Sequence, residues 1–200
     1  MDCKKVEMNA HEYYRWAKFN WWNYKLFAIQ LAKFKKARKI LDVGCGNGLL
    51  LDELRIFFPN AIIVGLDSSK DMLIVKKQTN VILGKAECLP FKNDFFDIVT
   101  CMYSLHEFDL SAIDEIRRVL KTGGLLAVKE INCSAPKWAL MHLKILLRMF
   151  FDEKTVKKHM DLYQTFHSPE KLIRFLEKSG FEVLKVNRSI LDFSVLCRKC

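Results

Sequence analysis

Three glycines at alternate positions, Gly44, Gly46 and Gly48, follow an apolar segment at residues 38–43 and precede a helix-like stretch. Glycine lacks a Cβ atom, so such a loop can adopt positive φ angles and approach a ligand closely. The free N–H groups at the start of the next helix favour a negative group on that ligand. A second apolar segment ends in Asp67, about 20 residues further on, where a carboxylate can accept hydrogen bonds from ribose hydroxyls. These residues predict a nucleotide-cofactor site.

The glycine spacing separates two classes of cofactor. Dinucleotide-binding dehydrogenases carry G-x-G-x-x-G, whereas this loop reads G-x-G-x-G. Over residues 41–48 the chain resembles the class I S-adenosylmethionine (SAM) methyltransferases, in particular the methyltransferase type 11 group that contains the quinone-biosynthesis methylases. Further segments that resemble motifs of this family follow in the family's order, at residues 86–91, 96–102, 120–125 and 179–181.

The resemblance implies that SAM is the cofactor and S-adenosylhomocysteine (SAH) the product. It places Asp42 near the ammonium group of SAM and Asp67 at its ribose. Many relatives have Asp where this chain has Lys85, so the adenine contact falls to Glu87 or to the backbone. The cofactor-binding residues that the resemblance implies are Asp42, Gly44, Cys45, Gly46, Gly48, Asp67, Ser68, Met72, Ala86, Glu87, Cys101 and Met102.

The methyl group of SAM is electrophilic, so the main task of the protein is to align an acceptor about 3 to 3.5 Å away in a dry pocket. A general base is optional. His106 is the catalytic candidate because it lies just beyond the fourth predicted strand, and imidazole transfers protons near neutral pH. The alternative for His106 is structural, as a helix cap or as filling of the cofactor pocket. His159, Tyr163 and His167 are weaker candidates, for which a structural role is favoured.

The elements that must position these residues alternate between strand and helix from residue 38 onward. Such alternation predicts an α/β fold with a parallel sheet and helices on both faces. We expect a Rossmann-like, doubly wound, mostly parallel seven-stranded sheet with an antiparallel last strand. The expected strands are residues 38–43, 61–66, 80–83, 96–102, 124–131, 181–187 and 190–197, and the expected helices are 48–58, 69–77, 110–120 and one starting at Ser168.

The composition fits one globular domain over residues 1–200, because 50% of the residues are hydrophobic. We expect a helical N-terminal cap at 1–37, a SAM-binding core at 38–131, a helical lid-like insert at 132–167, and a last helix and strand pair at 168–200. Residues 9–35 are unusually rich in aromatic side chains, and they read as one or two helices.

Segment 137–151 reads as a helix that is apolar almost all round, with Lys137, Lys144 and Arg148 on one narrow stripe. Such a helix is expected to be buried. Its place after the fifth strand suits a lid over an acceptor pocket, whereas plain core packing or a homodimer interface are the alternatives, and packing is favoured.

The cysteines and the lack of targeting signals point to the cytoplasm. No stretch reaches the about 18 uninterrupted apolar residues of a membrane span, and residues 1–5 lack the apolar run of a signal peptide. Seven cysteines without framework spacing fit a reducing compartment and predict no structural disulfide. Cys197 and Cys200 form a C-x-x-C pair, but a zinc site needs two more ligands, so no metal is expected.

The net charge of +10 is unevenly distributed. Residues 1–40 carry +7 and residues 133–200 carry +6, whereas residues 41–132 carry −3. Basic flanks can attract an acidic substrate, a nucleic acid or an anionic membrane surface, and solvated helix faces explain them equally well. Peripheral membrane contact therefore remains open, without a transmembrane segment.

The function that these observations favour is methyl transfer from SAM to a small-molecule acceptor, apolar or anionic, by in-line SN2 displacement. RNA methylation through the basic aromatic flanks is an alternative. Against it, residues 101–104 lack the Asn/Asp-Pro-Pro-aromatic motif of enzymes that methylate amino groups of nucleic acids. A second alternative is a non-catalytic SAM-binding regulatory or assembly protein, because no acceptor motif is recognisable.

Overall fold

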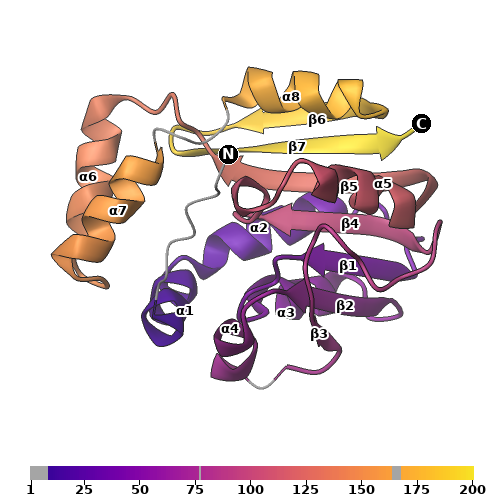
Figure 1. Cartoon of the computed structure of the whole chain (residues 1–200), viewed down its shortest axis with the longest axis horizontal. Coiled ribbons are helices and arrows are strands. Elements are labelled where there is room, and N and C mark those ends of the chain that lie inside the picture. The colour runs from indigo at the N-terminus through magenta and orange to yellow at the C-terminus, as the bar shows by residue number, and fades with distance from the viewer. Residues whose placement is uncertain (1–8, 77, 164–167) are drawn as a thin grey trace.

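A computed structural model describes residues 9–76, 78–163 and 168–200 of the chain (Figure 1). The strands are β1 (Lys39–Val43), β2 (Ile62–Asp67), β3 (Val81–Leu83), β4 (Phe96–Met102), β5 (Leu120–Ile131), β6 (Phe181–Arg188) and β7 (Asp192–Lys199). The helices are α1 (Ala10–Phe19), α2 (Trp21–Leu31), α3 (Leu49–Phe57), α4 (Lys70–Val75), α5 (Ser111–Val119), α6 (Lys137–Leu147), α7 (Glu153–Tyr163) and α8 (Pro169–Lys178), with a short 3₁₀ helix η1 (Leu105–Glu107).

All seven strands form one sheet in the order β3-β2-β1-β4-β5-β7-β6. Strands β1 to β5 pair in parallel, and β7 runs antiparallel to both β5 and β6. The order reverses between β1 and β4, because the chain moves from β1 toward one edge and from β4 toward the other. This confirms the expected doubly wound, mostly parallel sheet, and it puts a topological switch point at the carboxyl ends of β1 and β4.

Helices cover both faces of the sheet, and each face has its own core. On one face α5 and α8 bury side chains such as Ile113, Ile116 and Leu176 against the sheet. On the other face α2 and α3 bury Phe27 and Leu51, among others. The central strands β1 and β4 are apolar toward both faces because both faces are covered.

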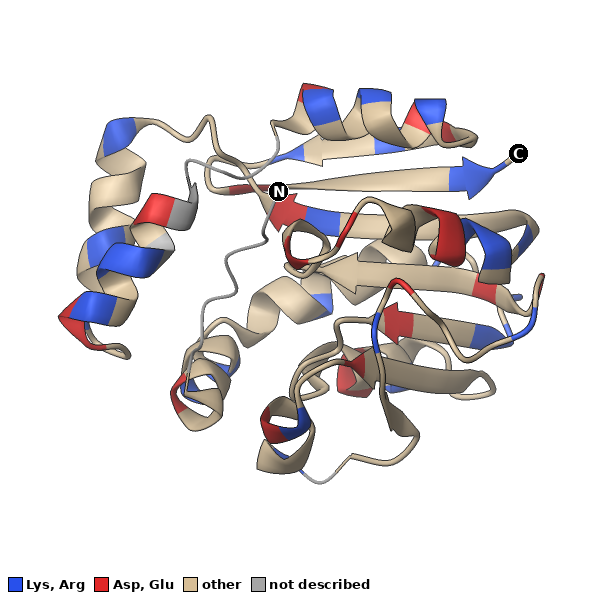
Figure 2. Ribbon diagram, in the orientation of Figure 1, with Lys and Arg blue, Asp and Glu red and all other residues tan. Residues whose placement is uncertain are grey.

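The remaining helices lie at the carboxyl ends of the parallel strands (Figure 1). Helices α6 and α7 pack together through Leu143, Leu147 and Val156, and Trp16 of α1 joins this small cluster. Figure 2 shows that Lys and Arg residues are frequent on α6 and α7. Within the described residues, no helix combines the length and the apolarity that crossing a bilayer requires.

Two expectations about local structure are corrected. The fifth strand was expected to begin at residue 124, but β5 already begins at Leu120 and contains both Gly123 and Gly124. The pairing with β4 shifts at this point, so the glycines lie in a β-bulge, where small residues are common.

The helix within 137–151 was expected to be buried, and this is wrong for one side of it. Only Ala139, Leu143 and Leu147 of α6 are buried. Trp138, Met141 and Ile145 are each 57% exposed. Apolar residues all round a helix show what it can bury, but the neighbouring elements decide how much of it is covered.

Candidate active site

Asp42 and Thr100 face each other across the switch point, paired in register between β1 and β4. The Thr100 hydroxyl donates a hydrogen bond of 2.7 Å to Asp42 Oδ1, and Asp42 is only 2% exposed. Burial raises the pKa of Asp42 to about 7, and the Asp67 charge adds to this, although the Thr100 hydrogen bond opposes it. A cation placed beside Asp42 would restore the charged carboxylate.

The glycine loop between β1 and α3 performs two different tasks. Gly44 has φ +73°, and a Cβ there would lie 2.4 Å from Ser104 Cβ, so this glycine allows the loop to pack against the protein. Gly46 has φ +51°, but a Cβ there would meet only Tyr13 Cε1, at 4.0 Å. Of these two positions, Gly46 therefore faces the open side on which a ligand can lie.

Asp67, at the end of β2, supports the loop. Its Oδ2 accepts a hydrogen bond of 2.7 Å from the Gly46 N–H, and its Oδ1 accepts one of 2.8 Å from the Ser69 N–H. Carboxylate oxygens accept hydrogen bonds from hydroxyl groups as well as from N–H groups, so a carboxylate of this kind suits a ribose. Asp67 thus joins the glycine loop to the start of α4, where the Ser69 side chain caps Met72 N.

Tyr13 of α1 covers this site, and the sequence analysis did not include it among the site residues. Burial raises its pKa to about 12, a hydrogen bond with Tyr24 opposes the rise, and the charges of Glu107, Asp67 and Glu130 add to it. Tyr13 is therefore close to carboxylates on both sides of the site. The aromatic density of residues 9–35 was the available signal, but it could not show which ring lies over the loop.

His106 in η1 is paired with a second residue that the sequence analysis missed. Its Nδ1 lies 2.9 Å from Glu130 Oε2, while Glu130 Oε1 accepts a hydrogen bond of 2.8 Å from the Leu105 N–H. Burial lowers the pKa of His106, but the charge and hydrogen bond of the Glu130 carboxylate, together with the charge of Glu107, outweigh burial and raise it. Glu130 is 4% exposed at the end of β5, and its two oxygens contact different residues of η1, which fixes the orientation of the carboxylate.

Comparisons with known proteins identify the family. Residues 41–128 match the family described as methyltransferase domain. The demethylmenaquinone methyltransferase of Staphylococcus aureus is 31% identical over 173 residues, which cover 76% of this chain and 71% of that enzyme. The chain belongs to the SAM-dependent methyltransferases.

The methyltransferase is similar to two further proteins of this kind. It is 28% identical to the ubiquinone biosynthesis O-methyltransferase of Glaesserella parasuis, over 74% of this chain and 67% of that one. A solved SAM-dependent methyltransferase of Thermotoga maritima is 25% identical, has a TM-score of 0.68, and is matched over 94% of this chain and 95% of its own. Small-molecule methyl transfer is thereby supported, and RNA methylation and a non-catalytic role are not favoured.

The charges of the site fit SAM, which is the cofactor of this methyltransferase. SAM carries a positive ammonium and a positive sulfonium. The site holds the buried Asp42 and also Asp67, and the negative charges of these two carboxylates repel each other. The backbone of Gly46, beside which there is space for a ligand, lies between them. A ligand with positive charge beside Asp42 and hydroxyl donors beside Asp67 would satisfy both carboxylates.

The other candidate residues lie at the expected strand ends but differ in accessibility. Ser68 is exposed and Met72 is half-buried, after β2. After β3, Ala86 is buried, and Glu87 Oε1 accepts a hydrogen bond of 3.0 Å from the Asp109 N–H. Cys45, Cys101 and Met102 are also buried, and Gly48 ends the loop beside Gln78.

The structure does not extend the catalytic set to the insert. The side chains of His159 and Tyr163 and the whole of His167 lie outside the described residues. At the other end of the chain, Cys197 is buried in β7 while Cys200 is exposed. Among the residues that the structure describes, no cluster of three or more His, Cys, Asp or Glu is arranged to hold a metal ion.

A second buried network lies on the other side of β5. Lys129 Nζ forms an ion pair of 3.0 Å with Asp192, and the Tyr103 hydroxyl donates a hydrogen bond of 2.7 Å to the same carboxylate. Tyr103 follows β4 with φ +55°, a left-handed conformation that is unfavourable for a tyrosine. These contacts connect the start of β7 to the end of β4, next to the candidate active site.

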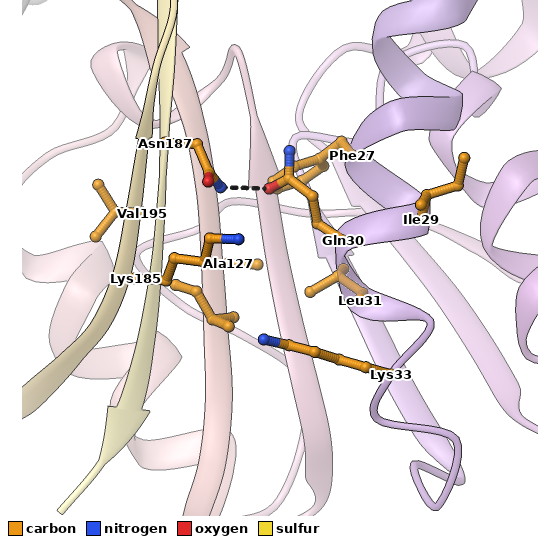
Figure 3. Close-up of a pocket in the computed structure, with 10 residues that line it drawn as sticks. Phe27, Ile29, Gln30, Leu31, Lys33, Ala127, Lys185, Asn187 and Val195 are labelled. Carbon is orange, nitrogen blue, oxygen red and sulfur yellow. Dashed lines mark hydrogen bonds between the residues drawn. The ribbon is translucent and has the colours of Figure 1, made fainter.

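A separate pocket of about 220 Å³ lies between α2 and strands β5 to β7 (Figure 3). Its walls include Phe27 and Ala127, and the Asn187 side chain donates a hydrogen bond of 3.1 Å to Gln30 across it. Lys33 and Lys185 lie on opposite sides of the pocket. The pocket is on the face of the sheet rather than at the strand ends, so it is distinct from the cofactor site.

Proposed function

We propose that the methyltransferase acts on a small aromatic acceptor with a hydroxyl group, of the quinol type, and that His106 is its general base. The observation that supports this most directly is the His106–Glu130 pair, which lies at the site that Tyr13 covers. The similarity to quinone-pathway methyltransferases supports the aromatic acceptor.

Glu130 has a positioning role in this proposal. A carboxylate beside Nδ1 favours the tautomer in which Nδ1–H donates to Glu130 Oε2. The lone pair is then on Nε2, which lies 4.0 Å from Glu107 Oε1, and in this proposal Nε2 accepts the proton of an acceptor hydroxyl. When bound, SAM supplies an electrophilic methyl group. The protein orients the acceptor, excludes water and removes the hydroxyl proton. The resulting oxyanion is a better nucleophile than the hydroxyl, and it also donates electron density to the ring carbons, which can then react in its place.

We propose that the described parts of the segments 1–37 and 132–167 form the acceptor side of a single domain around the core at 38–131. The contact of Trp16 with Phe150, at a ring-centroid distance of 5.4 Å, supports this because it joins α1 to the α6–α7 turn. We further propose a cytoplasmic enzyme, which the free thiols of the six described cysteines support. For segment 137–151, we propose a place on the acceptor side in preference to a homodimer interface.

The test is methyl transfer from labelled SAM to a panel of hydroquinones and catechols. We expect turnover with the wild type, and a fall in kcat of about 100-fold or more in His106→Gln with SAH affinity unchanged. His142→Gln, at an exposed histidine of α6, is the matched control and should keep full turnover. Full turnover in His106→Gln would overturn the base assignment, whereas a wild type that binds SAH and methylates no member of the panel would overturn the acceptor class.

The positioning role of Glu130 has its own readout in the pH profile. Because Glu130 raises the pKa of His106, kcat should rise with pH through that raised value in the wild type. In Glu130→Gln the midpoint should move to lower pH, and kcat at high pH should fall because the tautomer is less well fixed. A lower kcat with an unmoved midpoint would indicate a purely structural role.

A further inference from the structure

One face of α6 is apolar but not covered by the described residues. Trp138, Met141 and Ile145 recur at a spacing of three and four residues, so they lie on one side of the helix, and Met149 follows in the turn after α6. Their exposed fractions are 57% for the first three and 67% for Met149. The opposite face holds Ala139, Leu143 and Leu147 and is buried. We call Trp138, Met141, Ile145 and Met149 the apolar stripe.

A basic edge runs along the apolar stripe. At about 100° per residue, Lys137, Lys144 and Arg148 form a row beside it. Residues 137–163 contain six basic and three acidic side chains, and Figure 2 shows basic residues on both α6 and α7. Arg148 is paired with Glu153 at 2.7 Å, so most of the excess charge comes from the lysines.

The apolar stripe continues toward the active site through aromatic contacts. Phe150, next to Met149, lies 5.2 Å from Phe19 of α1 between ring centroids, and Phe19 lies 5.7 Å from Trp22. Phe19 and Trp22 are 43% and 41% exposed. The same helix α1 places Tyr13 beside Gly46. The exposed apolar surface therefore reaches from α6 to the helix that covers the active site.

We propose that the apolar stripe and its basic edge dock on the surface of an anionic lipid bilayer, with α6 lying in the plane of the interface. A helix with Trp and aliphatic residues on one face and lysines beside them is typical of interfacial binding, in which apolar area and attraction to anionic lipids act together. Large exposed apolar patches mark interaction sites. Charge complementarity favours anionic lipid over a second copy of the chain, because a symmetric dimer would bring the same basic edges toward each other.

This proposal does not depend on the acceptor or on His106, because bilayer binding is measured without turnover. The consequence for the enzyme is that an apolar acceptor dissolved in the bilayer reaches the active site along α1 without crossing bulk water. The surface that binds lipid is the surface next to the site, not the far edge of the sheet where β3 lies (Figure 1).

The experiment is co-sedimentation of the full chain with vesicles of phosphatidylcholine, with and without phosphatidylglycerol. We expect binding to vesicles with phosphatidylglycerol, weak binding to phosphatidylcholine alone, and a decrease at high salt. Ile145→Asp should reduce binding about tenfold or more, because it places a charge within the apolar stripe. Ile56→Asp is the matched control, since Ile56 is on α3 and is 67% exposed, and it should bind like the wild type.

The contribution of charge is tested by the double variant Lys137→Gln/Lys144→Gln. The control is the double variant Lys171→Gln/Lys178→Gln on α8, which removes the same number of positive charges. Only the α6 pair should weaken binding, by about tenfold or more. SAH titration of each variant checks that it is folded. The proposal is overturned if the wild type does not sediment with anionic vesicles, if both lysine pairs weaken binding equally, or if Ile145→Asp only dissociates a dimer seen by light scattering.

Discussion

At the scale of single residues, Asp42 is the most informative position, because its site is poorly suited to a charge in the absence of a ligand. Burial and the Asp67 charge raise its pKa to about 7, well above the ordinary value of an aspartate. Because the folded protein binds this proton more tightly than the unfolded chain does, the free energy of unfolding falls as the pH rises through 7. Ionised Asp42 therefore lowers the stability of the protein in the absence of a positively charged ligand.

The first prediction concerns this pH dependence. Between pH 6 and pH 8, the free energy of unfolding of the wild type should fall by roughly 1.4 kcal/mol relative to Asp42→Asn, as expected for one group of pKa about 7. Urea unfolding without SAM or SAH at both pH values measures the difference. The same variant should lose most SAH affinity if Asp42 binds the ammonium group, as the resemblance implies.

Asp161→Asn provides the control, since this aspartate is exposed on α7 and its difference from the wild type should be the same at both pH values. A stability gap between wild type and Asp42→Asn that does not change from pH 6 to pH 8 would contradict the raised pKa.

The two glycines of the loop give a second, paired prediction. Gly44→Ala should lower the free energy of unfolding by about 2 kcal/mol or more, because the new Cβ collides with Ser104 and φ is positive. Gly46→Ala should lower it by only about 1 kcal/mol, from the positive φ alone, but should weaken SAH binding.

Chemical unfolding and calorimetric titration of both variants separate these effects. Equal losses of stability at the two positions, or unchanged SAH affinity in Gly46→Ala, would mean that the open side of the loop is not the ligand side.

At the scale of elements, α1 is held over the active site by aromatic contacts with the α6–α7 turn. The Trp16 ring lies 5.4 Å from Phe150 and 6.4 Å from Phe151. Edge-to-face aromatic pairs contribute about 0.5 to 1.5 kcal/mol each beyond the area they bury. We therefore expect these contacts to hold α1 and α6–α7 together as one unit above the strand ends.

Trp16→Ala should loosen this unit without affecting the sheet. Hydrogen exchange followed by mass spectrometry should show faster exchange in α1, α6 and α7 and unchanged exchange in β1, β4 and β5. SAH should dissociate faster, because Tyr13 is on the same helix. Trp21→Ala, at an exposed tryptophan of α2, is the comparison and should exchange like the wild type. Faster exchange throughout the sheet would contradict a local role for Trp16.

The elements also show how far sequence could predict this protein. The glycine loop, the carboxyl ends of the strands and the start of the last helix at Ser168 are local patterns, and the structure has them within two residues of where they were expected. Glu130 was missed because its partner His106 is 24 residues away and meets it only through the packing of η1 against β5. The exposed side of α6 was missed for a similar reason, since its cover depends on where α7 and α1 pack.

At the scale of the whole molecule, charge and chemistry are separated in space. The core segment with the net negative charge holds Asp42, Asp67 and Glu130, which suits a cofactor with two positive groups. The described basic residues of the two flanks lie mainly on α1, α6 and α7 at the carboxyl ends of the strands, on α8 and the β6–β7 pair, and in the segment that joins α2 to the amino end of β1 (Figure 2). A positively charged cofactor and an anionic surface can thus be bound by one chain without competing for the same residues.

The position of β7 has a consequence for how the sheet is completed. Strand β7 lies between β5 and β6, although it follows both of them in the sequence. During synthesis, β6 therefore has no strand to join until β7 has emerged, and the edge of β5 stays unpaired for the same period. An unpaired edge of a central strand is a template for pairing between chains. Pairing of the β6–β7 hairpin with β5 accordingly completes the sheet. A nascent chain that stalls within this hairpin would expose an incomplete sheet whose free edge is prone to aggregate.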